Sequence, residues 1–144
     1  MAQDIHKLYG FIFKFTRKRR MSRFEAVMKP TDDTKILDVG GYSYNWMYLC
    51  QKPRVCLLNV SIPDSASTRN EQFTYVQGDG CSLNYDNQSF DVAFSNSVIE
   101  HVRDWQSQKR FAEEIRRVGK SLWVQTPARC FPVEPHLLAF VDKL

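Results

Sequence analysis

The apolar run Ile36–Val39, followed directly by Gly40 and Gly41, limits the folds that are open to this chain. A short run of this kind is typical of a buried β-strand, and the two glycines predict a tight turn after it. Glycine lets the backbone adopt conformations that other residues avoid and lets it approach a ligand closely. In an open α/β sheet, ligands bind just outside the carboxyl end of such a strand. The segment therefore predicts a strand and a binding turn in an α/β sheet.

Further β-prone runs alternate with helical or polar segments along the chain. The predicted strands cover residues 35–39, 54–60, 73–77, 90–95 and 121–126. Helices are predicted over residues 1–29, over a short stretch at 42–51 and from Asp104 to about Val118, and residues 62–71 are expected to form a loop or a short helix. Alternation of strands and helices implies βαβ units and a parallel sheet. The carboxyl ends of all five strands should then gather around one crevice.

Two of these helices carry specific side-chain expectations. In the segment after Asp104, which is a suitable N-cap, an apolar stripe should be buried and Gly119 should end the helix. The stripe consists of Phe111, Ile115 and Val118, and the outer side offers the pairs Lys109/Glu113, Arg110/Glu114 and Glu113/Arg117 at i, i+4. In the short helix at 42–51, the residues expected to face inward are Trp46, Met47, Leu49 and Cys50.

The composition is that of a single globular domain over residues 1–144, with 43% hydrophobic and 25% charged residues and a net charge of +4. The basic cluster Arg17–Arg20 is interpreted as a solvated helix face, with nucleic acid or anionic lipid as the alternative partner. The four cysteines show no zinc-site spacing and are expected to be reduced thiols, which favours a cytoplasmic protein. No signal peptide and no membrane span is expected.

Polar residues recur at the predicted strand ends. Asp38 closes the first strand, Asn59 closes the second, and Asp79 follows the third. In dinucleotide-binding folds, an acidic residue about 20 positions after the glycine turn binds ribose hydroxyls. Asn59 stands in that place, and Asp79 either accepts a hydrogen bond from an exocyclic amine or forms an ordinary Gly-Asp turn.

Residues 35–136 resemble the class I S-adenosylmethionine-dependent methyltransferases, of the small-molecule, methyltransferase type 11-like kind. The motifs that carry the resemblance are Ile36–Gly41, Gly78-Asp79, Phe90–Val102, Glu113–Val118 and Val124–Pro127. The resemblance implies a Rossmann-like three-layer sandwich with a mostly parallel sheet of about five strands that lacks the family's usual last two. Within the single domain, residues 1–34 would be a helical segment, 35–136 the cofactor-binding core and 137–144 the start of a missing C-terminal part.

The resemblance also implies a cofactor and its contacts. S-adenosylmethionine would bind at the strand ends, with Gly40 and Gly41 passing under its methionine portion next to Asp38. Asn59 would face the ribose and Asp79 the adenine. Ser95 and Asn96 would line the side on which the methyl group is transferred.

Three residues are candidates for the proton acceptor that helps when the methyl acceptor is a hydroxyl. His101 belongs to the family-like Glu-His-Val sequence, with a structural role as the alternative, and Glu134 and His136 follow the fifth strand. One carboxylate and one imidazole are too few for a metal site, so no metal is expected.

The family's glycine-rich loop has glycines at alternate positions, whereas this chain has Tyr42 and Tyr44 there. Three functions therefore stay open: a methyltransferase acting on a small-molecule or glycan-type acceptor, a non-catalytic binding module or incomplete fragment of the same fold, and a nucleic-acid methyltransferase. The sheet edge left by the missing strands could belong to a shortened natural form, be covered in a homodimer, or be completed by a further part of the protein.

Overall fold

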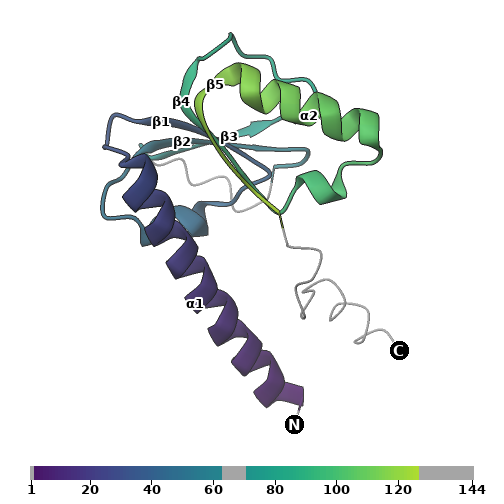
Figure 1. Ribbon diagram of the computed structural model, residues 1–144. Coiled ribbons are helices and arrows are strands. Elements are labelled where there is room, and N and C mark those ends of the chain that lie inside the picture. Colours follow the sequence, from purple (N-terminus) through teal and green to yellow (C-terminus); the bar gives the residue numbers. More distant parts are fainter. Residues whose placement is uncertain (1, 63–70, 127–144) are drawn as a thin grey trace.

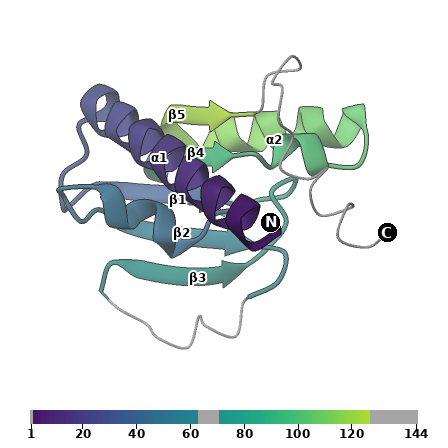
Figure 2. The ribbon, with the colours of Figure 1, turned by 90° about the horizontal axis from the view of Figure 1, so that it is seen from below.

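The computed structural model describes residues 2–62 and 71–126, with side chains described from residue 15 onward. Within these residues, five strands form one sheet in the order β3-β2-β1-β4-β5, and every pairing is parallel. The strands are β1 (Lys35–Val39), β2 (Arg54–Asn59), β3 (Phe73–Gln77), β4 (Phe90–Asn96) and β5 (Gly119–Gln125). The predicted Rossmann-like α/β sheet is confirmed, and its strands all point to one edge (Figure 2).

Helices α1 (Ala2–Met28) and α2 (Trp105–Val118) lie on opposite faces of this sheet (Figure 1). Successive side chains of a strand point to opposite faces, so the sheet divides the core into two clusters. On the α1 face, Met21 and Phe24 pack against Trp46 and Phe94. The cluster on the α2 face contains Leu37, Val39, Leu58, Ala93, Phe111, Ile115 and Val118.

Helix α2 follows the sequence expectation closely. The Asp104 carboxylate caps it by accepting a hydrogen bond from Ser107 N at 2.8 Å, and the predicted apolar stripe is buried. Gly119 is its C-cap with a φ of −98° and is also the first residue of β5. The turn into the strand therefore uses extended backbone rather than the left-handed conformation.

The charge pairs on α2 differ from those predicted. The predicted pair of Lys109 and Glu113 forms, with 3.9 Å between Nζ and Oε1. The other two predicted pairs do not form among the described residues. Instead, Arg117 Nε lies 2.8 Å from Glu114 Oε1, three residues before it. Arg117 turns toward the loop between β3 and β4, because it also donates to the carbonyl oxygens of Leu83 and Tyr85. It is therefore not directed along the solvent-exposed side of the helix.

The short helix predicted over 42–51 is the 3-10 helix η1 (Ser43–Tyr48). Its residues are weak helix formers, and Tyr42 provides no side-chain cap, which favours a short, tight turn. Trp46 is buried as predicted, but Met47 is 77% exposed and Cys50 is exposed. The expectation that these two face inward was wrong, because only one side of such a short turn meets the sheet.

Among the described side chains of α1, Met21, Phe24 and Met28 near its C-terminal end pack on the sheet, and the helix extends away from the sheet toward its N-terminal end (Figure 1). Its last residues are followed by Lys29, which has a φ of 46°, and by Pro30, which cannot continue a helix. Most of the connection predicted over 62–71 lies outside the described residues, as does everything after residue 126.

Candidate functional site

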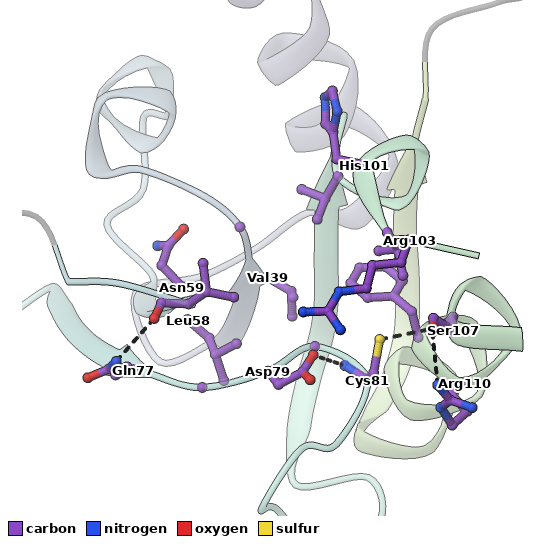
Figure 3. A pocket seen from close by; sticks show the side chains of 17 residues that line it. Val39, Leu58, Asn59, Gln77, Asp79, Cys81, His101, Arg103, Ser107 and Arg110 are labelled. Carbon is purple, nitrogen blue, oxygen red and sulfur yellow. Dashed lines mark hydrogen bonds between the residues drawn. The ribbon is translucent and has the colours of Figure 1, made fainter. Parts of the chain in front are cut away.

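A cavity of about 680 Å³ opens at the carboxyl edge of the sheet. The turns after β1, β2 and β3 form one side of it, and the segment from η3 (Ile99–His101) to the first turns of α2 forms the other (Figure 3). Its volume is in the range of pockets that bind small molecules. The strand ends that the sequence predicts to meet therefore do so, and the cavity that they enclose is the candidate site.

Asp38 is fully buried at the end of β1, beneath the glycine turn. Its Oδ2 accepts a hydrogen bond from Trp46 Nε1 at 2.8 Å, while its Oδ1 has no hydrogen-bond partner. Burial raises the pKa of this carboxyl to about 7, against the opposing effect of the Trp46 hydrogen bond. A Cβ atom at position 41 would overlap the carboxyl group, so only glycine fits above Asp38.

Gly40 is the residue of the turn that lines the cavity. It has a φ of 77°, and its N–H donates to Leu58 O at 2.7 Å. A Cβ atom here would lie 2.5 Å from Val98 Cγ2. Glycine is therefore required both for the conformation and for the close approach to the segment after β4.

Asn59 lines the cavity and also fixes the glycine turn. Its Nδ2 donates to Gly41 O at 2.9 Å, and no hydrogen bond of its Oδ1 is found among the described residues. The amide thus links β2 to the loop after β1 and leaves one acceptor for a ligand hydroxyl.

Asp79 lies in the turn after β3 and lines the cavity as predicted. Its Oδ1 accepts from Cys81 N at 2.8 Å, so the Gly-Asp turn also forms. The turn is held to α2, because the Cys81 thiol donates to Ser107 O at 3.4 Å and a Cβ atom on Gly80 would lie 2.6 Å from the Phe111 ring. The Asp79 carboxylate also interacts with the Cys81 thiol, whose pKa is raised first by burial and then by this negative charge.

Ser95 and Asn96 do not line the cavity. The buried Ser95 hydroxyl donates to Val39 O at 3.1 Å, which ties β4 to β1. Asn96 is half-buried, and its Oδ1 is a buried acceptor without a hydrogen-bond partner. Their role on the methyl-transfer side stays a prediction.

Of the three candidate proton acceptors, the structure describes His101. It lines the cavity at the end of η3, and its ring points away from Asp79 and Cys81 (Figure 3). Glu134 and His136 lie outside the described residues. The catalytic role of all three stays a prediction.

Arg103 and Arg110 also line the cavity, and neither was predicted. Arg103 precedes the N-cap Asp104, and Arg110 donates to Ser107 Oγ at 2.8 Å. Positive charge near the start of a helix is electrostatically unfavourable. Two arginines at the start of the predicted helix after the fourth strand are the sequence signal that could have indicated a role at the sheet edge.

Other kinds of site receive no support from residues 2–62 and 71–126. No group of three or more His, Cys, Asp and Glu side chains in this part of the chain could hold a metal ion. Cys50, Cys56 and Cys81 are free thiols, and Cys130 lies outside this part. None of the helices described here is both long and apolar enough to cross a bilayer.

A turn-lined crevice at the carboxyl edge of a parallel sheet defines a nucleotide-type binding site in an α/β protein. Residues 37–122 match the family model described as a methyltransferase domain, and the chain belongs to that family. No curated protein matches the sequence.

Solved structures share the fold. A putative S-adenosylmethionine-dependent methyltransferase from Methanococcus maripaludis is 18% identical to this chain, with a TM-score of 0.61. The matched region covers 85% of this chain and 61% of that protein's chain. The Burkholderia thailandensis 1,6-didemethyltoxoflavin-N1-methyltransferase, solved with S-adenosylhomocysteine, is 19% identical, with a TM-score of 0.59. The matched region covers 79% of this chain and 52% of that one. The 4+2 cyclase SpnF is 21% identical with a TM-score of 0.61, covering 74% and 43%. The chain thus spans 43% to 61% of the length of these structures.

The family match implies S-adenosylmethionine as the methyl donor, and the residues present fit this cofactor. Gly40 brings bare backbone, with a φ of 77°, to the wall of the cavity. Asn59 and Asp79 offer acceptors at the cavity, and Asp38 Oδ1 is an unpartnered buried acceptor beneath the turn. Such acceptors suit hydroxyl, amine and ammonium groups, all of which the cofactor carries.

Proposed function

We propose that this chain binds S-adenosylmethionine in the cavity and transfers its methyl group to a small-molecule or glycan-type acceptor. The observation that carries the proposal is the convergence of Gly40, Asn59 and Asp79 on one cavity of about 680 Å³. The cofactor supplies a methyl group on an electrophilic sulfonium. The protein then has to orient the two reactants and exclude water, which needs few reactive side chains. His101, at the cavity wall, is the candidate proton acceptor for a hydroxyl nucleophile.

Binding of S-adenosylhomocysteine, measured by isothermal titration calorimetry, tests the cofactor site without the need for an acceptor. Asp79→Asn keeps an oxygen for Cys81 N but replaces the other carboxylate oxygen with an amide donor and removes the negative charge. We expect about tenfold weaker binding, as for the loss of one hydrogen bond to a ligand. Asp86→Asn makes the same change outside the cavity and should leave the affinity unaltered. Absence of wild-type binding at millimolar ligand would refute the proposal.

A non-catalytic binding module is the second candidate, because Tyr42 and Tyr44 occupy positions at which the family has glycine. A cyclase among the structural neighbours also illustrates that this fold does not dictate one reaction. Cofactor binding without methyl transfer to any acceptor bound beside it would favour this second candidate. A homodimer and a cytoplasmic location stay predictions, and nucleic acid stays the less favoured partner.

A further inference from the structure

The loop after β1 carries two aromatic rings on the surface. The rings of Tyr42 and Tyr44 stack with their centroids 5.6 Å apart and an interplanar angle of 7°. They are 45% and 44% exposed, whereas Trp46 in the same loop is 1% exposed. The tyrosines therefore stack on one another instead of entering the core, and they leave aromatic surface open to a ligand.

Two arginines of α1 lie beside these rings. The Arg17 guanidinium is 4.4 Å from the centroid of the Tyr44 ring, a cation–π contact. Arg20 stands three residues after Arg17, one turn along the same helix, and partial burial and then the charge of Arg17 lower its pKa. Among the described residues neither arginine forms an ion pair with a carboxylate. We call Arg17, Arg20, Tyr42 and Tyr44 the tyrosine platform.

The tyrosines of the platform follow, along the chain, the turn that lines the cofactor cavity. Gly40, two residues before Tyr42, lines the cavity, and the Asn59–Gly41 hydrogen bond of 2.9 Å holds the intervening backbone. The platform itself is not part of the cavity wall. A second ligand could therefore occupy it while the cofactor site is filled.

We propose that the tyrosine platform binds the methyl acceptor, and that the acceptor has a planar aromatic ring bearing a carboxylate or phosphate group. The ring would stack on Tyr42, because the Tyr44 ring already contacts Tyr42 and the Arg17 guanidinium, and the anionic group would bind the two guanidinium groups. This inference rests on the proposed function and specifies its acceptor. A single-stranded nucleic acid fits the platform less well, because it binds through successive bases that stack on separate aromatic side chains along a basic groove. Tyr42 and Tyr44 instead stack on each other.

Binding of 2-naphthoate to the full chain, with S-adenosylhomocysteine present, tests the proposal by fluorescence titration. We expect 2-naphthamide, which lacks the charge, and cyclohexanecarboxylate, which lacks the aromatic ring, to bind at least tenfold more weakly. Tyr42→Ala and Arg20→Gln should each weaken 2-naphthoate binding about tenfold, while Tyr42→Phe should retain it. Arg19→Gln is the matched control, because Arg19 is exposed on the same helix and should have no effect. Thermal unfolding verifies that each variant is folded.

The outcomes separate this inference from the proposed function. Normal S-adenosylhomocysteine affinity without 2-naphthoate binding, or with binding that no platform variant changes, would overturn the inference alone. The inference would also be overturned if a ten-nucleotide oligothymidylate bound more tightly than 2-naphthoate and if Tyr42→Ala and Arg20→Gln weakened that binding. The platform would then bind nucleic acid. Loss of S-adenosylhomocysteine binding in the wild type would instead refute the proposed function.

Discussion

The two sides of the cavity are built from different interactions. On the α2 side, the turn after β3 is fixed by hydrogen bonds to α2, among them Cys81 to Ser107 and Leu83 N to Glu114 at 2.7 Å. On the α1 side, the loop after β1 rests on an aromatic cluster around Phe24 and on the buried hydrogen bond between Trp46 and Asp38.

The side of the cavity next to α2 follows the sequence pattern of the methyltransferase family, whereas the side next to α1 departs from it. Asp79 and its turn stand on the α2 side, where a regular helix defines the geometry. Tyr42 and Tyr44 stand on the α1 side, where the glycine pattern is broken. We therefore expect the α2 side to determine cofactor affinity and the α1 side to determine acceptor choice.

The largest expected effect concerns the aromatic cluster. The Phe24 ring makes edge contacts with Trp46, Phe94 and Trp123, at centroid distances of 5.5, 5.4 and 5.4 Å. Phe24→Ala should lower the free energy of unfolding by about 3–5 kcal/mol, because it opens a cavity in a packed core. Urea denaturation followed by circular dichroism measures this loss.

Phe15→Ala provides the matched control, since Phe15 lies on the same helix and is 60% exposed. It should change the unfolding free energy by no more than about 0.5 kcal/mol. If Phe24→Ala were equally mild, α1 would not be the support of the loop after β1.

The next effect is a pH dependence that originates at Asp38. Its pKa is about 7 in the folded protein against the ordinary aspartate value of 3.8, so the folded state binds this proton more tightly than the unfolded state. Its stabilising contribution is present below about pH 4 and is lost as the pH rises toward 7, by roughly 2–4 kcal/mol. Asp38→Asn cannot ionise and should remove this loss.

Unfolding free energies of the wild type and Asp38→Asn, measured from pH 4 to pH 8, provide the test. The difference between the two proteins should shift in favour of the variant as the pH rises. If the difference in unfolding free energy did not change with pH, Asp38 would already be ionised in the folded protein at pH 4. Its carboxylate would then have to be hydrated and not buried.

Much of the fold was predictable because local patterns and tertiary packing agree. The β1 and β3 ranges match the prediction residue for residue, and so does the buried stripe of α2. Alternating strands and helices implied the parallel order, which puts Asn59 and Asp79 at the edge that the cavity occupies. Those inferences needed only periodicity and chain direction.

Side-chain direction in irregular segments was not predictable in the same way. Met47 is apolar but exposed, since η1 is too short to bury more than one side. Ser95 lies near the end of β4, yet its hydroxyl donates to Val39 O of the neighbouring strand β1 instead of facing the cavity. The Tyr44 ring that stacks on Tyr42 is also contacted by Arg17 of α1, which is distant in sequence. Such features depend on contacts between elements, which one sequence does not reveal.

The smallest expected effect tests the α2 side. Glu114 accepts hydrogen bonds from Arg117 Nε at 2.8 Å and from Leu83 N at 2.7 Å, and these interactions lower its pKa. Glu114→Gln should cost about 1 kcal/mol of unfolding free energy at pH 7, because charge-assisted hydrogen bonds become neutral ones. Since the pKa of Glu114 is lowered in the folded protein, the deficit should disappear as the pH falls through that lowered value.

Glu113→Gln is the matched control, because its carboxylate lies 3.9 Å from Lys109 in an exposed pair. Such pairs contribute little, so this variant should stay within about 0.5 kcal/mol of the wild type in the same denaturation experiment. If the two variants were indistinguishable, Glu114 would not be what fixes the turn after β3. The hydrogen bond from Cys81 to Ser107 and the packing of Gly80 on Phe111 would then have to hold the Asp79 end of the cavity.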